Sequence, residues 1–344
     1  MNPYIQDILS QPETLRLALG SFSVEPLAHL HHRLHQNEFD RILITGMGAS
    51  YNAAYPAYLH LANQPLPVML VNAAELLHYS AGLIGPRSLI WLSSQSGRSI
   101  EVVRLLENFH SRPPLSVLAS VNDTSSPLAS AANICLPIYA GAEATVSTRT
   151  YVNMLAVNLL AAIALSGGDV QAAQGKLSAA AEAMQAYLDG WQTAVAELDA
   201  RLGKVKNLII LGRGPSLAAV WNGSLINKEA AKCTFEGMNS ADFRHGPLEL
   251  AAPDLTVLVF AGVQKTAGLN RELALEVIRL GGRSLWIAED PDPELPTLRL
   301  PAVAELALPL VEILPLQMLT ILMAQRNGLE AGKFRHVQKI TLRE

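Results

Sequence analysis

Two halves of the sequence repeat each other, and this repeat constrains the fold more than any other feature. Residues 41–50 read RILITGMGAS, and residues 207–216, at an offset of 166, read NLIILGRGPS with the same Ile, two Gly and Ser in matching places. At the same offset, SLIWLSSQSG at 88–97 aligns with DLTVLVFAGV at 254–263. A long-period repeat of this kind indicates one structural unit present in two copies.

The repeat continues toward the end of each copy. LSVLAS at 115–120 aligns with LWIAED at 285–290, and LPI at 136–138 with LPL at 308–310, at offsets that grow to 170 and 172. Short apolar runs are typical of strands that are buried on both faces of a parallel sheet. We therefore expect a strand at each of these segments.

Segments with helical spacing separate the expected strands. They cover residues 50–61, 99–109, 148–165, 217–232 and 266–280. Because a parallel strand needs a crossover, this alternation predicts an α/β protein with two parallel sheets in tandem, each covered on both faces. The predicted organisation is an N-terminal helical arm (1–36), a first copy (37–166), a helical connector (167–202), a second copy (203–330) and a C-terminal tail (331–344).

The composition indicates a compact globular protein that does not bind nucleic acid. Half of the residues are hydrophobic and 16% are charged. The 26 basic and 30 acidic residues give a net charge of −4, and no run of Lys or Arg occurs. The electrostatic attraction on which binding to nucleic acids depends is therefore missing, and anionic membranes are excluded for the same reason.

The cysteines and the first residues indicate a cytoplasmic protein. Cys135 and Cys233 stand far apart, outside any Cys/His cluster with metal-ligand spacing, so we expect free thiols. The N-terminus lacks the basic and apolar segments of a signal peptide. The apolar stretch 151–165 is too short to span a bilayer, and we expect it to be a buried helix.

Histidines in the arm raise the question of a metal site. Two of them have the i, i+4 spacing of metal ligands on a helix, but no Cys or carboxylate is placed to complete a set. A polar helix face explains them, and we expect no metal. These histidines are His29, His31, His32 and His35.

The first glycine-rich turn, GMGAS, follows the strand expected at 41–45. Turns at the carboxyl ends of parallel strands expose backbone N–H groups, and ligands bind there. This turn lacks the third glycine and the downstream acidic residue of a dinucleotide-binding motif, so we reject a nicotinamide cofactor. A tight strand-to-helix connection is the alternative to a ligand site.

A serine-rich turn, SSQSGRS at 93–99, is a stronger candidate. It follows a strand and precedes a helix, so hydroxyl and amide groups converge at a helix N-terminus, which suits a phosphate. Simple capping of the helix by serine is the alternative. The matching segment of the second copy, FAGV at 260–263, has no hydroxyls, so we expect only the first copy to bind phosphate.

Three further side chains could carry proton transfer. Glu229 lies on the helix after the second glycine turn, His245 follows in the segment ADFRHGP, and Lys339 lies in the tail. A Glu and a His brought together could act as a carbon base and a ring-opening acid/base. From spacing alone, the ordinary explanation is favoured, namely an exposed Glu, a loop His and a solvated Lys.

With these motifs in place, the chain resembles the tandem sugar-isomerase (SIS) family, whose subdomains are flavodoxin-like. The resemblance runs from the first strand to the last residue and is nearest to the isomerase half of glucosamine-6-phosphate synthase and to stand-alone type II glucosamine-6-phosphate deaminases. It rests on GMGASYNAA, SSQSGRS, AGAE (140–143), LGRGPS, NKE (227–229), FRHGPLEL, PLQ (315–317) and RHVQKITLRE.

The resemblance implies a role for each candidate residue. Glu229 would move a proton between C1 and C2, and His245 would assist ring opening across a homodimer interface. Lys339 would reach the open-chain carbonyl, as a Schiff-base former or as an electrostatic aid. No metal or organic cofactor is implied. The phosphate of a sugar 6-phosphate would be held by Ser50, Ser94, Gln95, Ser96 and Ser99.

Three departures from the synthase shape the expected activity. The chain has no place for a glutaminase domain with its nucleophilic Cys, so glutamine is not the expected ammonia source. Arg98 replaces an acidic residue and is similar to the loop of the type II deaminases. The segment EATVSTR at 143–149 is one residue shorter than in the synthase.

We expect a deaminase coupled to isomerisation, which converts glucosamine 6-phosphate to fructose 6-phosphate and ammonia. A ketose/aldose isomerase and a fructosamine-type 6-phosphate deglycase are alternatives with the same groups. A sensor that binds sugar phosphate without turnover is an alternative of another class. The sequence leaves open which sugar, which C4 epimer and whether the amine is substituted.

Overall fold

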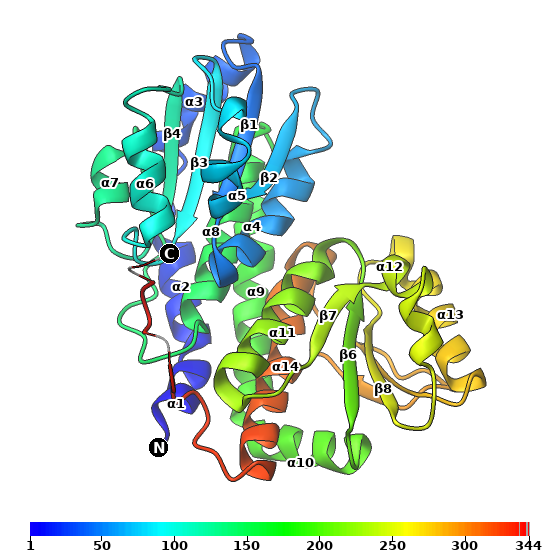
Figure 1. Ribbon diagram of the computed structural model, residues 1–344. Helices are drawn as coiled ribbons and strands as arrows, with labels where there is room; N and C mark the ends of the chain where they lie inside the picture. The colour runs from blue at the N-terminus through cyan, green and yellow to red at the C-terminus, as the bar shows by residue number, and fades with distance from the viewer. Residues whose placement is uncertain (337, 342, 344) are drawn as a thin grey trace. The chain divides into compact units, whose positions relative to one another are not determined.

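The computed structural model describes residues 1–336, 338–341 and 343; Val337, Leu342 and Glu344 of the predicted tail lie outside the described residues. Two parallel five-stranded sheets form the framework (Figure 1). The first has the order β2-β1-β3-β4-β5, and the second, β7-β6-β8-β9-β10, repeats that order. The predicted pair of doubly wound parallel sheets is therefore confirmed.

The strands are short and buried where they were predicted from apolar runs. The first sheet contains β1 (Arg41–Gly46), β2 (Val68–Asn72), β3 (Ser88–Ser94), β4 (Ser116–Val121) and β5 (Ile134–Pro137). The second contains β6 (Asn207–Gly212), β7 (Glu236–Asn239), β8 (Leu255–Phe260), β9 (Arg283–Ala288) and β10 (Thr297–Arg299).

Helices cover both faces of the first sheet. On one face, α5 (Ala73–His78), α6 (Ile100–Asn108) and α7 (Pro127–Ala131) enclose a core with alternate side chains of β1, β3 and β4. The other face is covered by α4 (Gly48–Leu61) and α8 (Arg149–Leu165), which pack against each other. Helix α8 includes the apolar stretch predicted to be a buried helix, and nearly all of its residues are buried.

The second sheet is covered in the same way. Phe243 of α12 (Ser240–Arg244) and Leu273 of α13 (Gln264–Arg279) share a core with Ile209, Leu211 and Val257 of the sheet. The opposite face is covered by α11 (Leu217–Ala231) and α14 (Leu308–Arg326). Short 3₁₀ turns lie at η1 (Ala81–Leu83), η2 (Gly214–Ser216), η3 (Pro247–Leu250) and η4 (Glu305–Ala307).

The remaining helices are α1 (Pro3–Leu9), α2 (Gln11–Ser21) and α3 (Glu25–His35) at the N-terminus, and α9 (Val170–Asp189) and α10 (Trp191–Leu202) between the sheets. The chain divides into two compact units. The first-sheet unit comprises residues 13–143, 147–178 and 335–344, and the second-sheet unit comprises residues 1–12, 144–146 and 179–334. The predicted domain boundaries stay a prediction.

One predicted strand is wrong. Leu308–Leu310 is the first turn of α14, and β10 takes the place of the expected strand beside β9. Pro309 explains the helix, because a proline in the first turn loses no helical hydrogen bond. The segment Glu305–Arg326 is long and apolar enough to cross a membrane, but 89% of its most apolar stretch is buried inside the protein, as in a core helix.

Candidate functional site

The strand order of the first sheet reverses between β1 and β3. From β1 the chain crosses to β2 on one side and then returns to β3 on the other, so the helices after β1 and β3 lie on opposite faces. Gly46 and Ser93, at the carboxyl ends of these strands, are partners in register. A Cβ atom at Gly46 would lie 2.7 Å from the Ser93 carbonyl oxygen, so this close approach requires glycine. Ligands of open α/β sheets bind at such a point.

The serine turn is folded by its own hydroxyls. Ser94 Oγ accepts a hydrogen bond from the Gly97 amide at 3.1 Å, and Ser96 Oγ accepts one from the Arg98 amide at 3.2 Å. Each hydroxyl acts as an acceptor in these bonds, so its own hydrogen remains able to donate to an anion. Ser99 is the N-cap residue of α6 but makes no capping hydrogen bond with its side chain. Capping therefore does not account for this serine.

The five predicted phosphate ligands lie on two adjacent turns. Ser94 ends β3, Gln95, Ser96 and Ser99 lie in the turn that follows, and Ser50 lies in the first turn of α4, directly after β1. Because β1 and β3 are neighbours and parallel, both turns lie at the same edge of the sheet. The structure thus brings these residues to one edge, and their role in binding stays a prediction.

Arg98 links the serine turn after β3 to the turn after β4 by hydrogen bonds. Its Nε donates to Asp123 Oδ2 at 3.0 Å, and its Nη2 donates to the carbonyl oxygen and the hydroxyl of Ser125 at 3.1 and 3.2 Å. Hydrogen bonds from Ser125 and Arg98 hold the pKa of the Asp123 carboxyl below its usual range. The amide of Asn122 donates to the Gln95 carbonyl at 3.0 Å. These hydrogen bonds join residues that are distant in the chain, so no local sequence pattern predicts them.

The C-terminal tail contacts the first-sheet unit at the start of α6 and at Glu143. The Thr341 carbonyl accepts a hydrogen bond from the Ile100 amide, at the start of α6, at 3.1 Å. Lys339 Nζ contacts Glu143 Oε2 at 3.2 Å and also donates to the Glu143 carbonyl. The carboxylate of Glu143 is fully buried and accepts further hydrogen bonds from the backbone and side chains of Thr148 and Thr150. Lys339 therefore has a fixed partner that the sequence did not reveal.

Glu229 and His245 lie in the second-sheet unit, on opposite faces of its sheet. Glu229 is half-buried in the last turns of α11, which covers one face together with α14. His245 is exposed at the end of α12, whose Phe243 is buried on the other face with α13. One copy of this unit therefore does not bring the two side chains together.

The second copy holds a carboxylate near its own glycine turn. Ser216, the counterpart of Ser50, donates its hydroxyl to Glu312 Oε1 at 2.8 Å, and both side chains are buried. Burial raises the pKa of Glu312 to about 7. Because the Ser216 hydroxyl is already donated to Glu312, it is not available to a phosphate, in agreement with the absence of hydroxyls in residues 260–263.

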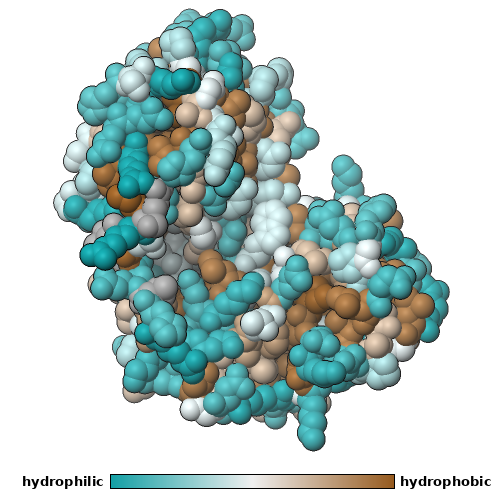
Figure 2. All heavy atoms as spheres, viewed as in Figure 1, coloured by the Kyte–Doolittle hydropathy of each residue, from teal (hydrophilic) through white to brown (hydrophobic). Residues whose placement is uncertain are grey.

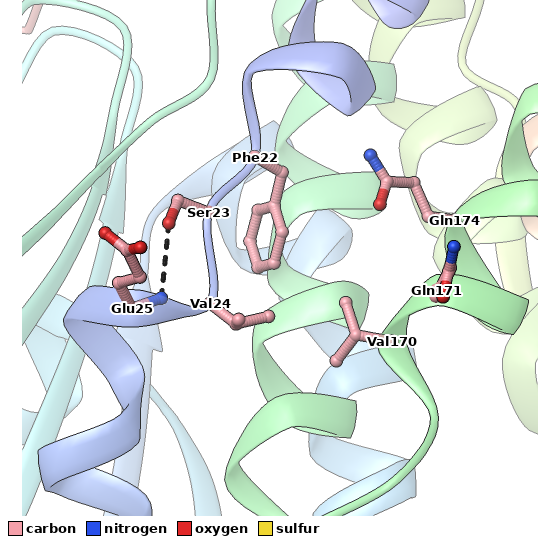
Figure 3. A pocket seen from close by; sticks show the side chains of 7 residues that line it. All are labelled: Phe22, Ser23, Val24, Glu25, Val170, Gln171 and Gln174. Atoms are coloured by element: carbon pink, nitrogen blue, oxygen red, sulfur yellow. Dashed lines mark hydrogen bonds between the residues drawn. The ribbon is translucent and has the colours of Figure 1, made fainter.

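The pocket drawn in Figure 3 and His31 do not form a second candidate site. The pocket in Figure 3 has a volume of about 380 Å³, and its lining residues, from the α2–α3 connection and from α9, include none of the predicted site residues. His31 Nδ1 lies 3.0 Å from the Leu165 carbonyl, which accounts for one histidine of the arm. Among the described residues, no group of three or more His, Cys, Asp or Glu side chains could hold a metal ion.

Comparisons with known proteins agree with this architecture. Residues 36–164 match the model of the SIS domain. This part of the chain, which contains the first sheet and the turns after β1 and β3, is a SIS domain.

Over 97% of its length, the chain is homologous to the isomerase half of glucosamine-fructose-6-phosphate aminotransferase. It is 29% identical to glutamine–fructose-6-phosphate aminotransferase (isomerizing) of Pyrococcus horikoshii, over 97% of this chain and 56% of that protein. The chain thus spans little more than half the length of this relative.

Solved structures share the fold over nearly the whole chain. The C-terminal domain of glucosamine-fructose-6-phosphate aminotransferase from Francisella tularensis has a TM-score of 0.83 at 20% identity, covering 97% of this chain and 98% of that one. Glucosamine-6-phosphate deaminase from Thermotoga maritima has a TM-score of 0.77 at 18% identity, covering 99% of each chain.

Proposed function

We propose that the protein is an enzyme that binds a hexosamine 6-phosphate and converts glucosamine 6-phosphate to fructose 6-phosphate and ammonia. The observation that carries this proposal is the pair of buried hydroxyls, Ser94 and Ser96, whose oxygens are already hydrogen-bonded and whose hydrogens remain for an anion at a helix N-terminus. The similarity to phosphosugar enzymes supports the same choice of ligand.

The proposed reaction uses the remaining residues as acid, base and electrophile. His245 assists opening of the sugar ring. Glu229 removes the proton from C2 of the open aldose and returns it to C1, so that the amine at C2 becomes an imine. Water adds to this imine, and C2 keeps the oxygen as a ketone while ammonia leaves. Lys339, held beside Glu143, lies at the sugar carbonyl as a Schiff-base former or as a positive charge.

We further propose that the protein acts as a homodimer in which His245 completes the site of the partner. Support comes from the placement of Glu229 and His245 on opposite faces of one sheet, and from the exposure of His245. Leu250, a few residues after His245, is 57% exposed, and hydrophobic residues gather over β6 and β8 of this unit in Figure 2. Exposed apolar surface of this kind suits an interface. Both cysteines are free thiols, which suits the cytoplasm that we propose as its location.

The test is a panel of 6-phosphosugars assayed for ammonia release and for ketose formation, in deuterium oxide. We expect both products from glucosamine 6-phosphate, with deuterium at C1. Glu229→Gln should abolish this exchange and retain ligand binding, whereas Glu236→Gln, an exposed residue of the same unit, should behave as wild type.

Each alternative has its own outcome in this panel. Ketose without ammonia would indicate an isomerase, and release of a substituted amine would indicate a deglycase. Binding without turnover would indicate a sensor. Failure to bind any sugar phosphate would overturn the proposal.

A further inference from the structure

Asn222, in the middle of α11, is fully buried, yet neither atom of its side-chain amide has a hydrogen-bond partner among the described residues. A buried polar group that loses its hydrogen bonds to water typically costs about 1–3 kcal/mol. Most buried side-chain amides in proteins are hydrogen-bonded, so an orphan pair of donor and acceptor needs an explanation. Asn227, on the same helix, is only half satisfied: its Nδ2 donates to the Gly223 carbonyl at 2.8 Å, whereas its Oδ1 has no partner among the described residues.

The position of Asn222 on the helix suggests what its partner is. Asn222 precedes Glu229 by seven residues. That spacing is about two helical turns, so the two side chains lie on one face with their Cα atoms about 10 Å apart. The other faces of α11 are occupied by neighbours in the same unit. Ser224 Oγ donates to the Phe235 carbonyl beside β7 at 2.8 Å, and Gly223 packs against Leu316 of α14.

We propose that Asn222 is a substrate-positioning residue that hydrogen-bonds a hydroxyl or carbonyl oxygen of the sugar chain. This inference rests on the proposed role of Glu229 as the base. A carboxamide is uncharged and can both donate and accept, so it matches a polyhydroxylated carbon chain rather than a phosphate. Its distance along the helix from Glu229 favours an extended, ring-opened sugar, whose hydroxyls reach Asn222 while C1 and C2 lie at Glu229. Asn222 then selects between epimers by the direction of one hydroxyl.

The experiment replaces the amide with an apolar side chain of similar size. Asn222→Leu removes two orphan polar atoms, so we expect it to unfold at the same or a higher urea concentration than wild type. We expect its affinity for glucitol 6-phosphate, an unreactive open-chain hexitol, to fall about tenfold in calorimetric titration, as the loss of one hydrogen bond to a ligand predicts. Its affinity for inorganic phosphate should stay within about twofold of wild type, because phosphate lacks the carbon chain.

Asn227→Leu is the matched control. It removes an amide from the same helix on the face toward α14, so it should lower stability and leave the ratio of the two affinities unchanged.

The outcomes separate this inference from the proposed function. If Asn222→Leu bound glucitol 6-phosphate as tightly as the wild-type protein does, the inference alone would be overturned. Asn222 would then be a buried side chain without a hydrogen-bond partner, or the partner of an internal water. Failure of the wild-type protein to bind any sugar phosphate would overturn the proposed function and the inference together. Equal weakening of both ligands would overturn the inference as well, because it would reflect a general distortion of the site.

Discussion

The contact between Lys339 and Glu143 offers the sharpest test of how the tail is held in place. The Glu143 side chain has no exposed surface, whereas 25% of the Lys339 side chain is exposed. Glu143→Gln keeps the volume but removes the negative charge, and Lys339→Met removes the ammonium. The double variant completes a cycle that isolates the energy of the pair.

The magnitude follows from burial and hydrogen bonding. Each hydrogen bond to a charged group contributes about 1.5–3 kcal/mol, and glutamine retains one acceptor oxygen for the amides of Thr148 and Thr150. We therefore expect Glu143→Gln to lower the free energy of unfolding of the first-sheet unit by about 2–4 kcal/mol. The coupling energy of the pair should be about 1–2 kcal/mol, since the partial exposure of Lys339 weakens it.

The assay compares this cycle with that of an exposed ion pair. Lys206 and Asp254 lie 2.8 Å apart, but their side chains are 76% and 42% exposed, so their coupling should stay below about 1 kcal/mol. Urea unfolding gives both cycles. Hydrogen exchange of the Ile100 amide, which donates to the Thr341 carbonyl, reports release of the tail directly and should accelerate in Glu143→Gln. A coupling no larger than that of the exposed pair, with unchanged exchange at Ile100, would refute the reasoning.

Three further predictions test other parts of the protein. Ser96→Ala should raise KM for a sugar phosphate at least several-fold and keep the fold, since one donor to a charged group contributes about 1.5–3 kcal/mol. Ser130→Ala is the control, because among the described residues this hydroxyl bonds only the Ser126 carbonyl. An unchanged KM in Ser96→Ala would show that Ser96 does not bind the phosphate. Burial raises the pKa of Glu312 from 4.5 to about 7, so between pH 4.5 and pH 7 the folded state binds more protons than the unfolded state. The free energy of unfolding should therefore fall by about 3 kcal/mol as the pH rises from 4.5 through 7. Glu312→Gln should match wild type in urea unfolding near pH 4.5 and exceed it at pH 8, and an equal difference at both pH values would contradict the assignment. Mixing inactive His245→Ala and Glu229→Gln proteins should restore up to about one quarter of the activity per site, because half of random dimers are mixed and half of their sites are intact; no recovery after verified subunit exchange would place His245 in the site of its own subunit.

The strands predicted from the sequence are those with a strong local signal. Runs such as SLIWLSS and LTVLVF become β3 and β8, because a strand buried on both faces favours a nearly continuous run of apolar side chains. Strands β2 and β7 were not predicted. Each lies at the edge of its sheet, and neither contains a fully buried residue. Strand β7, with the sequence EGMN, has no apolar run, whereas β2 has a run of only four apolar residues that no neighbouring motif marks as a strand.

In the candidate site too, features within a short segment could be predicted from the sequence, whereas contacts between distant segments could not. The serine turn could be predicted because its chemistry lies within seven consecutive residues. The pairing of Lys339 with Glu143 spans 196 residues and depends on where the tail lies, which no local pattern encodes. Asn222 was missed for another reason, since a single Asn in a helix has no signal until its burial and lack of partners are known.

The two copies of the repeat share a backbone but have diverged in chemistry. In the first copy, the turn after β1 carries a half-buried serine beside a second turn rich in hydroxyls. In the second copy, the equivalent serine is bonded to a buried carboxyl of α14, and this bond ties α11 to its neighbour. A helix fixed in this way is poorly suited to bind phosphate at its N-terminus, but it can hold a side chain near its other end in a constant position. In the function that we propose, the first copy therefore binds the anion, and the second copy supplies Glu229 from a rigid helix.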